Sequence, residues 1–187
     1  MIEPLLLTTA RVSTFDGKRP LTGASGFFFE REGRLFLVTS RHVVIDPPSK
    51  HFPNRIEIEL HTDAKNLTRS TVMSVLLYLD AKSVWHQGND AGGEIDVAVI
   101  ELDHGALPQS VVLRCFTPAH LQRSLQEVEV GTSLLIVGFP ARFPRRAAPL
   151  ACGAAGGHLH AMMSGNGALD ADHPFIARRM LNFNHGS

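Results

Sequence analysis

The chain has 187 residues, the length of one ordinary domain with room for a hydrophobic core. Hydrophobic residues make up 44% and charged residues 19% of it, and 18 basic and 18 acidic side chains give a formal net charge of zero. This composition excludes general disorder and a general attraction to nucleic acid, so no nucleic-acid partner is expected. The two cysteines, Cys115 and Cys152, are too few for a disulfide framework.

The chain begins MIEPLLLTTARV, with no basic region and only three consecutive leucines. A secretory signal or a membrane span needs a longer apolar run, so neither is predicted. We therefore expect a cytoplasmic location and no membrane partner. The pattern from Leu5 to Val12 predicts a first β-strand, followed by a polar turn over Asp16–Pro20.

The segment Gly23–Val44, GASGFFFEREGRLFLVTSRHVV, predicts a β-hairpin. Its two aromatic and β-branched runs, Phe27–Phe29 and Leu35–Val38, flank a charged, glycine-containing turn over Glu30–Arg34. His42 follows the second run, between small residues and two valines, which would seat the imidazole at the strand end. Alternatively, this histidine only packs against its neighbours or caps them.

Four further segments lie between His42 and the next acidic motif. Asp46–Lys50 contains paired prolines and predicts a surface loop. Arg55–His61 alternates polar and apolar residues, which predicts a strand with one solvated face. Thr71–Leu79 is apolar and β-branched and predicts another strand, whereas the polar segment Lys82–Gly93 predicts a loop that Trp85 anchors.

Asp96 precedes four apolar residues in the predicted strand Gly93–Glu101. Because the four apolar residues after Asp96 are expected to be buried, Asp96 is not explained as an ordinary solvent-exposed side chain. The alternative is a carboxylate that caps a turn at the start of the strand. Six strand candidates up to Ile100 are the number that a six-stranded antiparallel barrel needs.

A linker over Leu107–Gln126 follows, with a possible helix start at Thr117. Beyond it, Glu127–Val130 alternates and Thr132–Gly138 is an apolar run, so both predict short strands. The second run leads into Gly138-Phe139-Pro140.

Three segments, in this order, resemble the trypsin-like serine protease family in its disulfide-poor, bacterial-type form. Gly23–Val44 matches a strand that leads through a hairpin into T-x-x-H, in which the histidine is the general base. Glu94–Glu101 matches the D-x-A-[VL]-[IVL] segment that supplies the triad aspartate, and Thr132–Pro140 ends like the G-[YF]-P of the second barrel. The resemblance covers residues 5–140 almost continuously.

The resemblance implies an all-β, trypsin-like double β-barrel whose first barrel is complete and whose second is incomplete. Residues 1–106 would form the first barrel and residues 107–140 the linker and the start of the second. Residues 141–187 would be a divergent tail. His42 would then act as general base and Asp96 as its orienting carboxylate, within hydrogen-bond reach of each other. No cofactor and no metal are expected.

The composition changes after Pro140. Residues 141–187 contain no Val, Thr, Gln, Lys or Glu, but ten alanines and six glycines. Five Arg against two Asp give them a charge of +3, whereas 13 basic and 16 acidic residues give the preceding part −3. Such a tail is a poor candidate for a second barrel. Either it is divergent and partly disordered, or the chain is truncated or frame-shifted here. A one-nucleotide shift at Ala141–Gly157 permits a peptide that resembles the family's continuation.

The family carries its nucleophilic serine in a G-x-S-G-[GSA]-P loop, and the sequence contains no such string. The nearest match is Asn184–Ser187, which makes Ser187 a degenerate candidate nucleophile. Ser164 is a weaker candidate, because the surrounding S-G-N-G is as easily a turn.

Two functions follow from the resemblance. The first is a serine endopeptidase, which hydrolyses peptide bonds of a peptide or protein substrate through an acyl-enzyme. Because the serine loop is missing, this chain would be inactive or weakly active. The second is a non-catalytic member of the same fold that binds peptides or partner proteins in the barrel cleft.

Two other groups of residues carry less weight. A metal site could be assembled from Cys152, His158, His160, His173 and His185. These residues have no known zinc-ligand spacing, however. The arginines within residues 142–146 form a basic cluster of a kind that is more often solvated than bound to nucleic acid.

Overall fold

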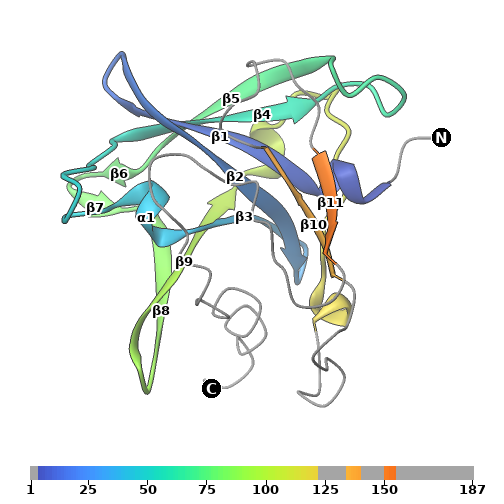
Figure 1. Ribbon diagram of the computed structural model, residues 1–187. Coiled ribbons are helices and arrows are strands. Elements are labelled where there is room, and N and C mark those ends of the chain that lie inside the picture. Colours follow the sequence, from blue (N-terminus) through green and yellow to red (C-terminus); the bar gives the residue numbers. More distant parts are fainter. Residues whose placement is uncertain (1–3, 122–133, 140–149, 155–187) are drawn as a thin grey trace.

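The computed structural model describes residues 4–121, 134–139 and 150–154, which form mostly antiparallel β-sheet (Figure 1). The all-β prediction is therefore confirmed. The main sheet contains β1 (Thr9–Asp16), β2 (Arg19–Arg31), β3 (Arg34–Thr39), β4 (Arg55–His61), β5 (Ser70–Leu76), β8 (Trp85–Asp90) and β9 (Gly93–Leu102). These seven strands run in the order β5-β4-β1-β2-β3-β9-β8.

The remaining elements are short. Two small sheets pair β6 (Tyr78–Leu79) with β7 (Lys82–Ser83), and β10 (Leu134–Gly138) with β11 (Leu150–Ala154). One helical turn, α1 (Arg41–Val44), follows β3. The 3-10 turns are η1 (Pro4–Thr8), η2 (His104–Ala106) and η3 (Pro118–His120). Within the described ranges, no helix combines the length and apolar character that a membrane crossing needs.

One hydrophobic core holds the sheet together. Alternation in β4 buries Ile56, Ile58 and Leu60 to 1% exposure or less, as the sequence pattern predicts. The same core takes side chains from β1, β2, β3, β8, β9 and α1. The two edge strands, β5 and β8, are separated in the chain by the fully buried Leu77 and by the β6–β7 hairpin. Both ends of the sheet thus contribute to one core, although no strand pairing between β5 and β8 closes a barrel in the described part.

The β2–β3 hairpin was predicted from the sequence and is confirmed. Its turn is tighter than expected, because pairing continues to Arg31↔Arg34 and leaves only Glu32 and Gly33 unpaired. Both turn residues have positive φ, 54° and 73°. A two-residue turn of this kind follows the right-handed twist of the flanking strands, and glycine adopts it without a steric cost.

Gly26 of β2 has no room for a side chain. A Cβ built there would lie 2.8 Å from Leu37 Cδ1 and 3.0 Å from the Val38 carbonyl oxygen. Because Leu37 is fully buried and Val38 offers backbone, Gly26→Ala should cost about 1–3 kcal/mol of the free energy of unfolding. Urea denaturation measures this loss. Gly23→Ala is the matched control, since its Cβ meets nothing within 4 Å; an equal loss in both variants would contradict the packing argument.

The beginning of the first strand differs from the prediction. The strand starts at Thr9 and not at Leu5, because Pro4–Thr8 forms a 3-10 turn. The Thr8 hydroxyl donates to the Leu5 carbonyl at 2.6 Å, and the next threonine hydroxyl makes the same three-residue contact at 3.2 Å. These side-chain bonds compete with the extended conformation that the apolar pattern favours.

The predicted loop over Lys82–Gly93 is wrong for most of its length, because Lys82–Ser83 forms β7 and Trp85–Asp90 forms β8. β8 pairs with β9, and the β8–β9 hairpin extends away from the rest of the sheet (Figure 1). β8 is held by main-chain hydrogen bonds to β9, and most of its side chains are exposed to solvent. Its sequence therefore lacks the apolar pattern from which a strand could be predicted. Trp85 lies in the core at 9% exposure, the anchoring place that the sequence suggested.

The small sheet of β10 and β11 pairs a strand before Pro140 with a strand in the tail that follows it. β10 lies inside the predicted strand Thr132–Gly138, whereas β11 lies within the tail and was not predicted. Their antiparallel pairs run from Leu134↔Ala154 to Gly138↔Leu150. After β10, the Phe139 amide donates to the Ser25 hydroxyl of β2 at 2.8 Å, which ties this sheet to the main one. The other predicted strand, over Glu127–Val130, lies outside the described residues.

Candidate active site

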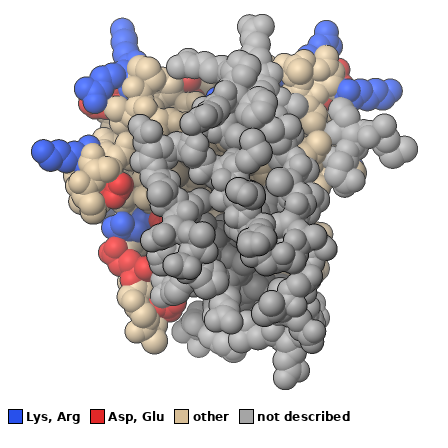
Figure 2. Space-filling model, in the orientation of Figure 1, with Lys and Arg blue, Asp and Glu red and all other residues tan. Residues whose placement is uncertain are grey.

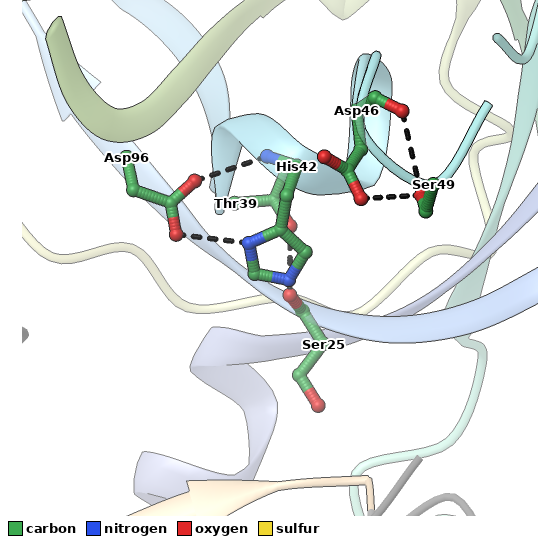
Figure 3. Close-up of polar contacts among 6 residues, drawn as sticks. All are labelled: Ser25, Thr39, His42, Asp46, Ser49 and Asp96. Carbon is green, nitrogen blue, oxygen red and sulfur yellow. Dashed lines mark hydrogen bonds and ion pairs between the residues drawn. The ribbon is translucent and has the colours of Figure 1, made fainter. Parts of the chain in front are cut away.

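His42 projects from α1, the helical turn that directly follows β3. Val43 and Val44 anchor this turn in the core at 6% and 0% exposure, as the valines after the histidine suggested. The strand end before it is fixed by Thr39, whose hydroxyl donates to the Ser25 carbonyl at 2.9 Å (Figure 3). The turn therefore holds its backbone against the sheet while the His42 side chain remains 62% exposed.

Asp96 lies in an irregularity of the β8–β9 ladder. Three residues of β9, Ile95–Val97, face only Gly88 of β8, because the register shifts between the two flanking pairs. Those pairs are Gln87↔Ala98 and Asn89↔Glu94. Bulges of this kind release a side chain from the regular alternation and are common beside functional sites. The bulge leaves Asp96 between two paired parts of β9, in contact with α1.

The structure brings the two predicted residues into hydrogen-bond contact. Asp96 Oδ2 lies 2.9 Å from His42 Nδ1, and Asp96 Oδ1 accepts the backbone N–H of His42 at 3.0 Å (Figure 3). One carboxylate thus holds both the ring and the backbone of the histidine. With Nδ1 donating to the carboxylate, the neutral ring leaves Nε2 free to accept a proton. No described residue makes a hydrogen bond to Nε2.

The contact shifts the pKa values of both groups. The hydrogen bond to Asp96 raises the pKa of His42; burial opposes this rise, and the charges of Asp96 and Asp46 add to it. Figure 3 shows these two carboxylates on opposite sides of the imidazole. Burial acts to raise the pKa of Asp96, but hydrogen bonds from the His42 ring and backbone outweigh it, so this pKa lies below its usual value. The pair of His42 and Asp96, which we call the dyad, therefore stabilises an imidazolium beside a carboxylate.

The pair of His42 and Asp96 should stabilise the fold only in a window of pH. The contribution of His42 is fully present below its ordinary pKa of 6.5 and is lost as the pH rises through the raised value. The contribution of Asp96 is present above 3.8 and is lost as the pH falls through the lowered value. The difference in unfolding free energy between wild type and Asp96→Asn should be largest between pH 3.8 and 6.5.

The expected size of this difference is below about 1 kcal/mol, because both side chains are more than half exposed to solvent. Urea denaturation of the two proteins across the pH range measures it. A difference that continued to grow towards alkaline pH would contradict the assigned signs.

The other candidate site residues are not brought to the dyad. Ser187 and Ser164 lie outside the described residues, as do His158, His160, His173 and His185, and of Cys152 only the backbone, in β11, is described. Among residues 4–121, 134–139 and 150–154, no three His, Cys, Asp or Glu side chains are grouped as metal ligands. An open, polar hollow of about 630 Å³ lies elsewhere, over the outer face of β1, β4 and β5.

Sequence reasoning missed four residues beside the dyad. Arg41 and Asp46 flank His42 along the chain, but nothing in their spacing distinguishes them from surface charges. Gln87 and Glu94 fell in or next to the predicted loop over Lys82–Gly93. A correct prediction of β8 could have found them, because it would have placed both on the hairpin that carries Asp96.

No family model matches this chain, and neither a curated protein nor a solved structure matches it. The geometry of the site itself therefore has to indicate the function.

Proposed function

We propose that His42 and Asp96 are the general base and the orienting carboxylate of a trypsin-like serine endopeptidase site, in a chain of low activity. One observation carries the proposal: Asp96 Oδ2 lies 2.9 Å from His42 Nδ1 while Nε2 has no bond to a described residue. A carboxylate at Nδ1 and a free Nε2 are what a histidine needs to accept a proton from a nucleophilic hydroxyl.

The chemistry assigns a separate task to each group. His42 Nε2 takes the proton of the attacking serine hydroxyl, and the oxygen bonds to the scissile carbonyl carbon. The imidazolium then gives this proton to the leaving amine as the carbon–nitrogen bond breaks, which leaves an acyl-enzyme. A water molecule repeats the sequence and releases the acid. Throughout, Asp96 holds the tautomer and stabilises the imidazolium, in agreement with the raised pKa of His42.

The proposed fold is a trypsin-like double barrel, with β1 to β9 in the first barrel and β10–β11 at the start of the second. The strand order supports the first part. Because only buried Leu77, the β6–β7 hairpin and Val84 separate β5 from β8 in the chain, the two can serve as one barrel strand that the hairpin interrupts. Such a strand would pair with β4 along its first half and with β9 along its second half.

A second function is favoured by one feature of the sequence. The chain contains no G-x-S-G-[GSA]-P string, since its one G-x-S-G, Gly23–Gly26, is followed by phenylalanines and lies in β2. An acyl-transfer site without that loop lacks both its usual nucleophile and a formed oxyanion hole. The alternative is a non-catalytic module of the same fold that binds peptides or partner proteins. His42 and Asp96 occur in both proposals, so only the reactivity of a serine can separate them.

Labelling with a fluorophosphonate probe tests the choice, because the probe reacts with a serine activated by a base. Slow labelling of the wild type that depends on His42 supports the weakly active endopeptidase. Saturable binding of unstructured peptides without any labelling favours the binding module. Rapid labelling that His42→Ala abolishes would overturn the proposed low activity, while labelling independent of His42 would overturn the proposed base.

A further inference from the structure

Three side chains beside the dyad each contact the other two: Arg41, Gln87 and Glu94. We call this group the clamp. Arg41 Nε donates to Gln87 Oε1 at 2.7 Å, and an Arg41 terminal nitrogen lies 3.0 Å from Glu94 Oε2. Gln87 Nε2 donates to Glu94 Oε1 at 3.2 Å, which completes the triangle. The Arg41 side chain is only 23% exposed, so the central cation is largely covered.

The positions of the clamp residues relate it to the dyad. Arg41 directly precedes His42 in α1, and Glu94 lies two residues before Asp96 in β9. Gln87 and Glu94 belong to the last regular pair before the bulge and the first after it. The guanidinium therefore connects the helical turn that carries the base to both flanks of the bulge that carries the carboxylate. Figure 2 shows acidic and basic side chains side by side over this hairpin, at the lower left.

Regular structure does little to hold these two elements at a fixed separation. α1 has only four residues, and Ser40 at its N-cap makes no side-chain capping bond. The bulge residues Ile95–Val97 lie outside the regular β8–β9 pairs, and pairing of β9 with β3 ends at Ala98. Apart from Val43 and Val44 in the core and the bond from the His42 amide to Asp96 Oδ1, the alignment of α1 with the hairpin therefore depends on contacts between side chains.

We propose that Arg41, Gln87 and Glu94 position Asp96 against His42 by bracing the β8–β9 bulge to α1. The inference deepens the proposed function, because these are positioning residues for the same base. It does not need the chain to be catalytically active, since the contact that they support is formed within the first 102 residues. Charged and neutral hydrogen bonds of this kind act as a unit, so removing one member should loosen the others.

The charge of Arg41 separates a positioning role from a purely electrostatic one, because the two roles change the pKa of His42 in opposite directions when Arg41 is replaced. As a nearby cation, Arg41 disfavours protonated His42, so removing its charge alone would raise the pKa of His42. As a positioning residue, it maintains the contact with Asp96 that raises this pKa, so removing it would lower the pKa. Gln87 carries no charge, and its replacement affects the pKa of His42 through position alone. The other carboxylate that faces the ring, Asp46, is unchanged in both variants.

The experiment measures the pKa of His42 by NMR titration of the ring carbons in histidine-labelled full-length protein. His42→Gln identifies the resonance, and Asp96→Asn gives the pKa without the carboxylate. We expect Gln87→Leu and Arg41→Met each to lower the pKa of His42 from the wild-type value towards the Asp96→Asn value. Arg34→Met is the matched control, because it removes the same charge from a contact between β3 and β9, with Glu101, and should leave the pKa unchanged.

Each other outcome has a distinct meaning. If Asp96→Asn lowers the pKa of His42 but Gln87→Leu does not, or if Arg41→Met raises it, the positioning role is overturned and the dyad stands. If Asp96→Asn itself leaves the pKa unchanged, the dyad that underlies the proposed function is wrong. A dispersed amide spectrum in every variant establishes that the protein remains folded during the comparison.

Discussion

Replacing Phe28 with alanine should lower the free energy of unfolding by about 3–5 kcal/mol. The ring is 2% exposed, on β2 at the middle of the seven-stranded sheet, and belongs to the core cluster of the described residues. Truncation would leave a cavity between strands whose backbones are fixed by pairing on both sides, so the surrounding core could collapse only in part. Urea denaturation with an unchanged m-value measures the loss.

Phe52 provides the matched control, because its side chain is among the large hydrophobic residues that remain exposed, at 54%. Phe52→Ala should change the free energy of unfolding by no more than about 0.5 kcal/mol. Equal losses in the two variants would show that Phe28 does not occupy the interior of the fold. The loss at Phe28 matters for the site as well, since Leu37, Val43 and Val44 share the same core and seat α1.

The second large effect concerns reactivity. His42→Ala should slow the reaction with a fluorophosphonate by about 10⁴-fold or more relative to wild type, because the nucleophile loses the base that takes its proton. Asp96→Asn should cause a loss of about 10⁴-fold, since asparagine would stabilise the wrong tautomer of the ring. The second-order rate constant of labelling is the quantity to compare. Because the comparison uses the ratio of the variant's rate constant to that of the wild type, it remains informative even if the wild type is labelled slowly.

His104→Ala is the control for this experiment. His104 is an exposed histidine of η2, and its replacement should leave the labelling rate unchanged. If His42→Ala and His104→Ala labelled as fast as the wild type, the labelled serine would be activated by another group. The proposed role of His42 would then be wrong.

Much of the first part of the fold could be predicted from local patterns. The alternation of Arg55–His61 states which face of β4 is buried, and the two apolar runs around Gly33 predict a hairpin whose register follows from its two-residue turn. The approach of His42 to Asp96 could be expected only from the order of motifs. The two residues are 54 positions apart, so no local pattern could report their contact.

The remainder depended on contacts that have no local signal. β8 is held to β9 by main-chain bonds, so its polar residues, from His86 to Asp90, resemble a loop. The 3-10 turn before Thr9 depends on threonine hydroxyls that compete with an apolar strand pattern. The clamp joins residues 46 positions apart, Arg41 and Gln87, whose chemistry is unremarkable until the fold brings them together.

The central claim is that Asp96 holds Nδ1 of His42 and leaves Nε2 free to act as a base. A long-range ¹H–¹⁵N correlation of the histidine rings, recorded at a pH above the titration of His42, tests it directly by showing which nitrogen carries the proton. The structure predicts a protonated Nδ1 and an unprotonated Nε2, and predicts that Asp96→Asn loses this preference. Protonation at Nε2 in the wild type, with a bare Nδ1, would contradict it.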